Sequence, residues 1–236
     1  MTQHNRTTRR EFVTEAGALA AAASLGTLGS LGMPAVAHAD SAPESPHSLP
    51  VDWDLSWVDG LATATDRAVF DWPSLGDPAD PMTMQLAGRY LDGCAAVYAG
   101  RTYRAAVVLN IRTTAVPAGL HDRLWEKYAL GVEYKTNDPH TRAPAVRNPF
   151  WHPAPELMPG YTSPSISTLV GQGAIALVCD FALGHLAKRL AAARKETPDA
   201  VHADLRAGLV RGAFAVPSGI YGMAKAQNAG CGLVRM

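Results

Sequence analysis

Residues 169–190 constrain the fold more than any other part of the sequence. An apolar run at residues 174–178 is followed at once by Cys179 and Asp180, and then by apolar residues at helical spacing. This order predicts a buried parallel strand, a tight turn that carries a cysteine, and a helix packed back over the sheet. Ligands of open α/β sheets bind beyond the carboxyl ends of the strands. Cys179 therefore stands where such a fold places its chemistry.

The rest of the chain, after its N-terminal segment, alternates between strand and helix patterns. This alternation predicts an α/β fold, with a small and mainly parallel sheet covered by helices on both faces. The expected strands are residues 67–72, 104–111, 174–178, 213–216 and 231–234. The expected helices are residues 82–99, 122–130, 180–194, 200–208 and 220–229. We place the domain at residues 65–236, preceded by a lead-in at residues 40–64.

Two tryptophans stand four residues apart in the lead-in. Their spacing predicts that Trp53 and Trp57 pin this segment onto the domain as one helical turn. A ligand cage is the alternative, although paired aromatic side chains are more often a packing feature.

A Pro-rich insertion occupies residues 133–164. It holds seven prolines, a density that long helices and central strands do not tolerate. The segment is also too long for a routine connection. It is a lid over a site, an arm that docks a neighbouring subunit, or an insertion packed on its own domain. Residues 148–153 are its strongest candidate anchor, and Trp151 and His152 are candidate binding residues.

The first 39 residues have the pattern of an export signal. Arg9 and Arg10, followed by Glu-Phe-Val, resemble the twin-arginine signal. A weakly apolar segment at residues 16–33 and a small-x-small site ending at Ala39 follow. A membrane anchor is the alternative, but the glycines of this segment and the cleavage site favour removal. We therefore expect a periplasmic or extracellular protein without a stable membrane anchor.

The charge balance of the sequence argues against two classes of binding partner. The sequence has 21 basic and 21 acidic residues, a formal net charge of zero. Nothing in this balance favours binding to nucleic acid or to an anionic membrane surface. The three cysteines are too few for a disulfide framework.

Two stretches together resemble the DsrE/DsrF-like sulfur-relay family. They are residues 173–183, GAIALVCDFAL, and residues 216–230, VPSGIYGMAKAQNAG. The resemblance implies a flavodoxin-like three-layer α/β fold, assembly into homotrimers or homohexamers, and a cysteine that carries sulfur as a persulfide. Cys179 matches the position of that cysteine. Relatives place a His-Gly pair after the second strand, and Asn110 stands there in this chain, which makes it a candidate binding residue.

The reactivity of Cys179 has arguments on both sides. The start of a helix favours a thiolate, whereas the neighbouring carboxylate of Asp180 opposes one. His185, six residues on, is expected on the far side of the helix and is a poor base. His121 is the weak candidate base, with Asp122 placed to hold its ring. The alternative is that Cys179 is only a small buried apolar residue.

Two functions remain open from the sequence. The first is an exported DsrE-like protein that carries sulfur from an unidentified donor, or does other thiol chemistry, at Cys179. The second is a non-catalytic oligomeric module that binds a small molecule or a protein through the Pro-rich insertion. The histidines lack the spacing of a metal site and the glycines lack that of a dinucleotide site, so we expect no metal and no cofactor. The sequence does not decide whether the protein is an enzyme.

Overall fold

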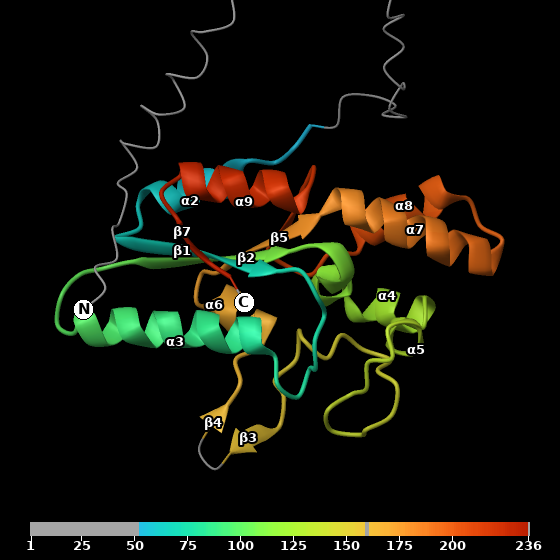
Figure 1. Ribbon diagram of the computed structural model, residues 1–236, viewed down its shortest axis with the longest axis horizontal. Helices are drawn as coiled ribbons and strands as arrows, with labels where there is room; N and C mark the ends of the chain where they lie inside the picture. Colours follow the sequence, from blue (N-terminus) through green and yellow to red (C-terminus); the bar gives the residue numbers. More distant parts are fainter. Residues whose placement is uncertain (1–51, 159–160, 236) are drawn as a thin grey trace, which may run out of the picture. The chain divides into compact units, whose positions relative to one another are not determined.

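The computed structural model describes residues 52–158 and 161–235, and its main feature is a five-stranded parallel sheet (Figure 1). The strand order is β6-β5-β2-β1-β7, with every neighbouring pair parallel. The strands are β1 (Asp66–Trp72), β2 (Ala105–Ile111), β5 (Ile175–Cys179), β6 (Ala213–Val216) and β7 (Gly232–Val234). The α/β fold expected from the sequence is confirmed.

The central strands form where the sequence is apolar on both faces. From Ala106 to Ile111 every residue of β2 is buried, and from Ala176 onward every residue of β5 is buried. These two strands pair with Val108 opposite Ile175. Helices must therefore cover both sides of the sheet, because both faces of these strands are apolar and have to be buried away from water.

Helices cover the sheet as two layers, one on each face. One layer holds α2 (Ser56–Ala62) and α9 (Gly219–Asn228), and it packs on side chains such as Val108 and Leu177. The other layer holds α3 (Met82–Val97), α6 (Ile166–Gly171) and α7 (Asp180–Arg194). Figure 1 shows α2 and α9 on one side of the sheet and α3 and α6 on the other.

This layering sends the chain in opposite directions after two neighbouring strands. The helix α7, which follows β5, packs on one face together with α8 (Pro198–Ala207), whereas α9, which follows β6, packs on the other face. Strands β5 and β6 are paired, with Cys179 opposite Val216. The two outgoing segments therefore diverge from adjacent strand ends, which is the arrangement that opens a crevice in doubly wound sheets.

The connection from β2 to β5 is long and irregular. It contains the 3-10 helix η1 (Thr113–Gly119), α4 (Asp122–Lys127), α5 (Leu130–Glu133) and a hairpin of β3 (Glu156–Met158) and β4 (Tyr161–Thr162). The single helix expected at residues 122–130 is wrong, because Ala129 takes a left-handed conformation with φ of 49° and separates α4 from α5.

The Pro-rich insertion is anchored on its own domain by two buried residues. The side-chain amide of Asn148 donates to the carbonyl oxygens of Ala118 and Leu120, at 2.8 and 2.7 Å. Phe150 is fully buried, with its ring edge-on to Trp72 at 5.6 Å between centroids. At these residues the insertion is therefore part of the main core.

The N-terminal tryptophans do not share one helical turn. Trp57 lies in α2 and is buried with Leu61, whereas Trp53 precedes the helix and lies under the guanidinium of Arg206, 4.9 Å from its ring centroid. The folded domain therefore extends N-terminal of residue 65, the boundary expected from the sequence.

Cys94, Cys179 and Cys231 are all free and buried. Among the described residues, every helix is too short or too polar to cross a bilayer. The signal residues Arg9, Arg10 and Ala39 lie outside the described residues.

Candidate functional site

A pocket of about 380 Å³ lies at the carboxyl ends of β2, β5 and β6. Its walls come from the loop after β2, the start of the Pro-rich insertion, α7 and the start of α9. The lining residues are Arg112, Thr113, Thr114, Tyr134, Cys179, Phe181, Ala182, His185, Leu186, Arg189, Ser218, Gly219 and Ile220. The pocket thus occupies the crevice between the diverging helices α7 and α9, where open α/β sheets bind ligands.

Cys179 is the last residue of β5 and the N-cap of α7. Its Sγ accepts a hydrogen bond from the backbone N–H of Ala182, at 3.4 Å. The residue is only 5% exposed, but it lines the pocket. Negative charge on Sγ would be stabilised by this N–H group and by the positive end of the α7 dipole.

The carboxylate of Asp180 does not line the pocket. Its Oδ1 lies 3.0 Å from Nε2 of His202 and 3.5 Å from Nη1 of Arg206, both on α8. The opposition to a thiolate that the sequence suggested is therefore weakened, because this carboxylate pairs with basic groups of its own.

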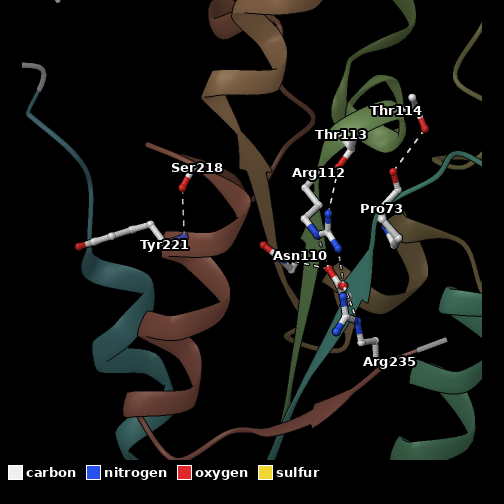
Figure 2. A network of polar contacts seen from close by, with 9 residues as sticks. Pro73, Asn110, Arg112, Thr113, Thr114, Ser218, Tyr221 and Arg235 are labelled. Atoms are coloured by element: carbon white, nitrogen blue, oxygen red, sulfur yellow. Dashed lines mark hydrogen bonds and ion pairs between the residues drawn. The ribbon is translucent and has the colours of Figure 1, made fainter. Parts of the chain in front are cut away.

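Arg112, which lines the same pocket as Cys179, is fixed in place by a buried carboxylate. Nε and Nη2 of Arg112 lie 2.7 and 2.8 Å from the two oxygens of Asp71, whose side chain is fully buried. Nε of Arg235 lies 3.7 Å from Oδ2 of the same carboxylate, and the amide of Asn110 donates to its Oδ1 at 3.3 Å. Figure 2 shows the side chains of Asn110, Arg112 and Arg235 close together. The network holds Arg112 at the pocket wall, because two parallel hydrogen bonds to the carboxylate fix the orientation of its guanidinium group.

The charges of this network reinforce one another. The hydrogen bond from Arg112 holds the pKa of Asp71 below its ordinary value, against the effect of burial. The same bond raises the pKa of Arg112, and the sulfur of Cys179 adds a smaller contribution in the same direction. Arg112 is therefore a permanent positive charge on the wall of the pocket that Cys179 also lines.

A glycine lets the start of α9 contact Arg112 closely. A methyl group added at Gly219 would lie 2.5 Å from Cβ of Arg112. The preceding residue, Ser218, caps α9 by accepting from the backbone N–H of Tyr221 at 3.1 Å (Figure 2). The sequence Ser-Gly at this point therefore both begins the helix and leaves room for the arginine.

The far wall combines a second arginine with aromatic rings. Nη2 of Arg189 donates to the hydroxyl of Tyr134 at 2.8 Å and lies 3.5 Å from Oε1 of Glu133. Burial raises the pKa of Tyr134, so its hydroxyl stays protonated at neutral pH. The ring of Phe181 lies edge-on to that of His185, with 4.7 Å between centroids.

The expectation for His185 was wrong, because this residue lines the pocket. Helical spacing from Cys179 placed it on the far side, but Cys179 is the N-cap and its side chain folds back over the first turn. The pocket face of α7 is instead set by Phe181, Ala182, His185, Leu186 and Arg189. These positions follow the helical repeat among themselves.

His121, the weak candidate base, does not line the pocket. It is the exposed N-cap of α4, where its Nδ1 accepts from the backbone N–H of Arg123 at 3.3 Å. The intervening η1 carries the chain away from the end of β2 before this residue is reached. Asp122 does not hold the ring of His121 but pairs with Nε2 of His152, at 2.8 Å.

The three candidate binding residues also lie away from the pocket. Asn110 is fully buried and donates to Asp71 at 3.3 Å, while its Oδ1 has no partner in the described part of the chain. Trp151 packs partly buried against the main core, and His152 pairs with Asp122. Asn110 therefore supports the site through Asp71, whereas Trp151 and His152 hold the insertion.

Sequence analysis did not identify three residues of the pocket lining, two arginines and a serine whose hydroxyl caps a helix. Arg112 follows β2 directly, so its place after a buried strand was the available signal. Ser218 stands in a Pro-Ser-Gly sequence that is typical of a turn, and Arg189 has no signal beyond its position in an expected helix. Residues 52–158 and 161–235 contain no cluster of three or more His, Cys, Asp or Glu side chains suited to a metal.

Comparisons with known proteins do not extend these observations. No family model matches the chain, and no curated protein or solved structure matches it either. The assignment of a function therefore depends on the residues of the pocket.

Proposed function

We propose that this chain is an exported DsrE-like protein whose Cys179 carries sulfur as a persulfide. The observation that supports the proposal most directly is the position of Cys179, at the wall of a pocket that also holds Arg112. A thiol at a helix start, in a pocket that also holds a fixed cation, has the surroundings of a reactive cysteine. The strand-cysteine-helix order agrees with the family resemblance of residues 173–183.

The proposed step transfers one sulfur atom. The Cys179 thiolate attacks the terminal sulfur of a donor persulfide, R–S–SH, and forms a new S–S bond. The S–S bond of the donor breaks, its electron pair leaves with R–S⁻, and Cys179 becomes Cys–S–SH. No external oxidant is needed, because the donor already holds the oxidised sulfur.

Mass spectrometry of the reduced full-length protein tests this step. After incubation with a persulfide donor and an alkylating block, the peptide that holds Cys179 should gain one sulfur atom. Cys94 and Cys231 are buried, lie outside the pocket lining, and serve as internal controls. An unmodified Cys179 in the folded protein, together with modification in urea-unfolded protein, would refute the proposal.

Export and assembly belong to the same proposal. Replacement of Arg9 and Arg10 by lysine should leave the full-length precursor in the cytoplasm. N-terminal sequencing of the exported protein should begin at Asp40 if cleavage follows Ala39. Light scattering should show a homotrimer or homohexamer, and a monomer at all concentrations would contradict the assembly that the resemblance implies.

A second candidate function is a non-catalytic binding module. The observation that favours it is Tyr134, which belongs to the Pro-rich insertion and lines the pocket beside Arg189. Under this function Cys179→Ser would leave ligand binding and assembly unchanged, whereas Tyr134→Ala would weaken binding. A persulfide found on Cys179 alone would favour sulfur transfer over it.

A further inference from the structure

The pocket carries positive charge without a matching carboxylate on its walls. Among its described lining residues, Arg112, Arg189 and His185 are the basic side chains, and neither Asp nor Glu is present. In the described part of the chain, the acidic groups paired with these two arginines are Asp71, which is fully buried, and Glu133, which is outside the lining. Such a lining favours an anion over a cation or a neutral molecule.

The two arginines differ in their freedom to bind a ligand. Arg112 already makes two hydrogen bonds to the buried Asp71, and its side chain is only 17% exposed. The side chain of Arg189 is 54% exposed, and its acidic partner lies at the longer distance of 3.5 Å. Arg189 is therefore the cation that can turn to an incoming anion, while Arg112 is a fixed wall charge.

Apolar side chains flank the same pocket. Phe181 and Ile220 stand in the first turns of α7 and α9, and they are 64% and 60% exposed although both are large and apolar. Scattered exposed apolar residues are ordinary, but these two come from the two diverging helices and border one cavity. Leu186 adds a buried apolar wall.

We infer that the pocket binds a small organic anion with an apolar body. The acidic group of the ligand is placed at Arg189, and its apolar body lies against Phe181 and Ile220. The volume of about 380 Å³ lies within the range of about 300–1,000 Å³ that is usual for small-molecule sites. The inference names a ligand class for the site of the proposed function and so rests on that site, but it requires no chemistry at Cys179.

Isothermal titration calorimetry with three inert probes tests this inference. Phenylbutyrate has both the anion and the apolar body, phenylbutanol has the body alone, and butyrate has the anion alone. Full-length protein with Cys179→Ser should bind phenylbutyrate at least about tenfold more tightly than either of the others, because each part contributes separately. The substitution removes thiol reactions from the measurement.

Two variants locate the binding. Arg189→Met should weaken phenylbutyrate binding about tenfold, since a charge-assisted hydrogen bond is lost. Lys188→Met removes the same charge from the next position of α7, which is exposed and outside the pocket lining, and should change the affinity by less than about twofold.

The outcomes separate this inference from the proposed function. Absence of phenylbutyrate binding up to about 10 mM, or equal affinity for phenylbutanol, overturns the inference and points to a protein partner or a neutral ligand. Equal effects of the Arg189 and Lys188 variants overturn it as well. Loading of Cys179 with sulfur is measured independently, so probe binding without loading refutes only the proposed function.

Discussion

Replacing Asp71 by Asn should destabilise the fold through Arg112. The carboxylate of Asp71 is fully buried and accepts two hydrogen bonds from Arg112, at 2.7 and 2.8 Å, and one from Asn110. Asparagine keeps the shape of the side chain but removes its charge. The guanidinium of Arg112, which is only 17% exposed, would then be buried without a counter-charge.

The expected magnitude follows from this burial. Removing one partner of a buried ion pair costs about 3–5 kcal/mol. Partial exposure of Arg112 and the acceptor oxygen of the new amide reduce that cost, so we expect about 3 kcal/mol for Asp71→Asn. Replacing both members, as Asp71→Asn with Arg112→Met, should cost less than the sum of the single variants by about 2 kcal/mol.

Urea denaturation at neutral pH measures these free energies of unfolding. Asp92→Asn is the matched control, since this exposed aspartate on α3 should change stability by less than about 0.5 kcal/mol. A loss below about 0.5 kcal/mol for Asp71→Asn, or additive single and double variants, would refute the reasoning.

The pH dependence gives a second readout with a definite sign. Arg112 lowers the pKa of Asp71 below 3.8 in the folded protein. A group with a lowered folded pKa stabilises the fold above its unfolded pKa, and this stabilisation is lost as the pH falls through the folded value. The difference between the original protein and Asp71→Asn should therefore be constant at neutral pH and shrink below pH 3.8.

Four further substitutions, one of them a control, test packing and charge by urea denaturation. Gly219→Ala, with its added methyl 2.5 Å from Cβ of Arg112, should cost about 1–3 kcal/mol, whereas Gly184→Ala on α7 meets nothing within 4 Å and should gain about 0.5–1 kcal/mol; equal changes would contradict the close approach. Phe150→Ala should cost about 3–5 kcal/mol, and a loss under about 1 kcal/mol would mean that the insertion is not part of the core. Burial raises the pKa of Asp204, but hydrogen bonds from Lys127, Tyr128 and Arg123 outweigh this and lower it to about 2. Asp204→Asn should therefore cost about 1 kcal/mol at neutral pH after solvent screening, and this cost should disappear as the pH falls from 3.8 towards 2; a cost that is independent of pH would exclude the charge as its cause.

The strands could be predicted closely because local apolar runs determine them. The run at residues 174–178 became β5 (Ile175–Cys179), and the short apolar segment at residues 213–216 became β6 with the same bounds. β5 is buried from Ala176 onward between two helix layers, whereas β6 is an edge strand that is fully buried only at Val216. The helix expected at residues 220–229 likewise ends close to the end of α9, since Gly230, with a positive φ of 90°, follows the C-cap Ala229.

The candidate site could be predicted only in part, because its members meet through non-local packing. Cys179 was identified from its place between strand and helix, a local signal. His185 was misplaced because helical spacing was counted from a capping residue, and His121 was misplaced because η1 was not foreseen. Arg189 and Tyr134 are far apart in the sequence and meet only in the folded chain, where the tyrosine hydroxyl accepts a hydrogen bond from the arginine.

The location of the pocket follows from which face each helix covers, a property that local patterns do not encode. Both α7 and α9 begin with a side chain that accepts from its own first turn, Cys179 in one and Ser218 in the other. If both helices packed on the same face, the segments after β5 and β6 would run side by side and leave no crevice. Because they pack on opposite faces, the two capped helix starts border one cavity, and Arg112 reaches it from the neighbouring strand β2. Because the helices that follow β5 and β6 pack on opposite faces, one cavity brings together a thiol, a fixed cation and two helix starts. The cysteine motif alone would not predict this arrangement.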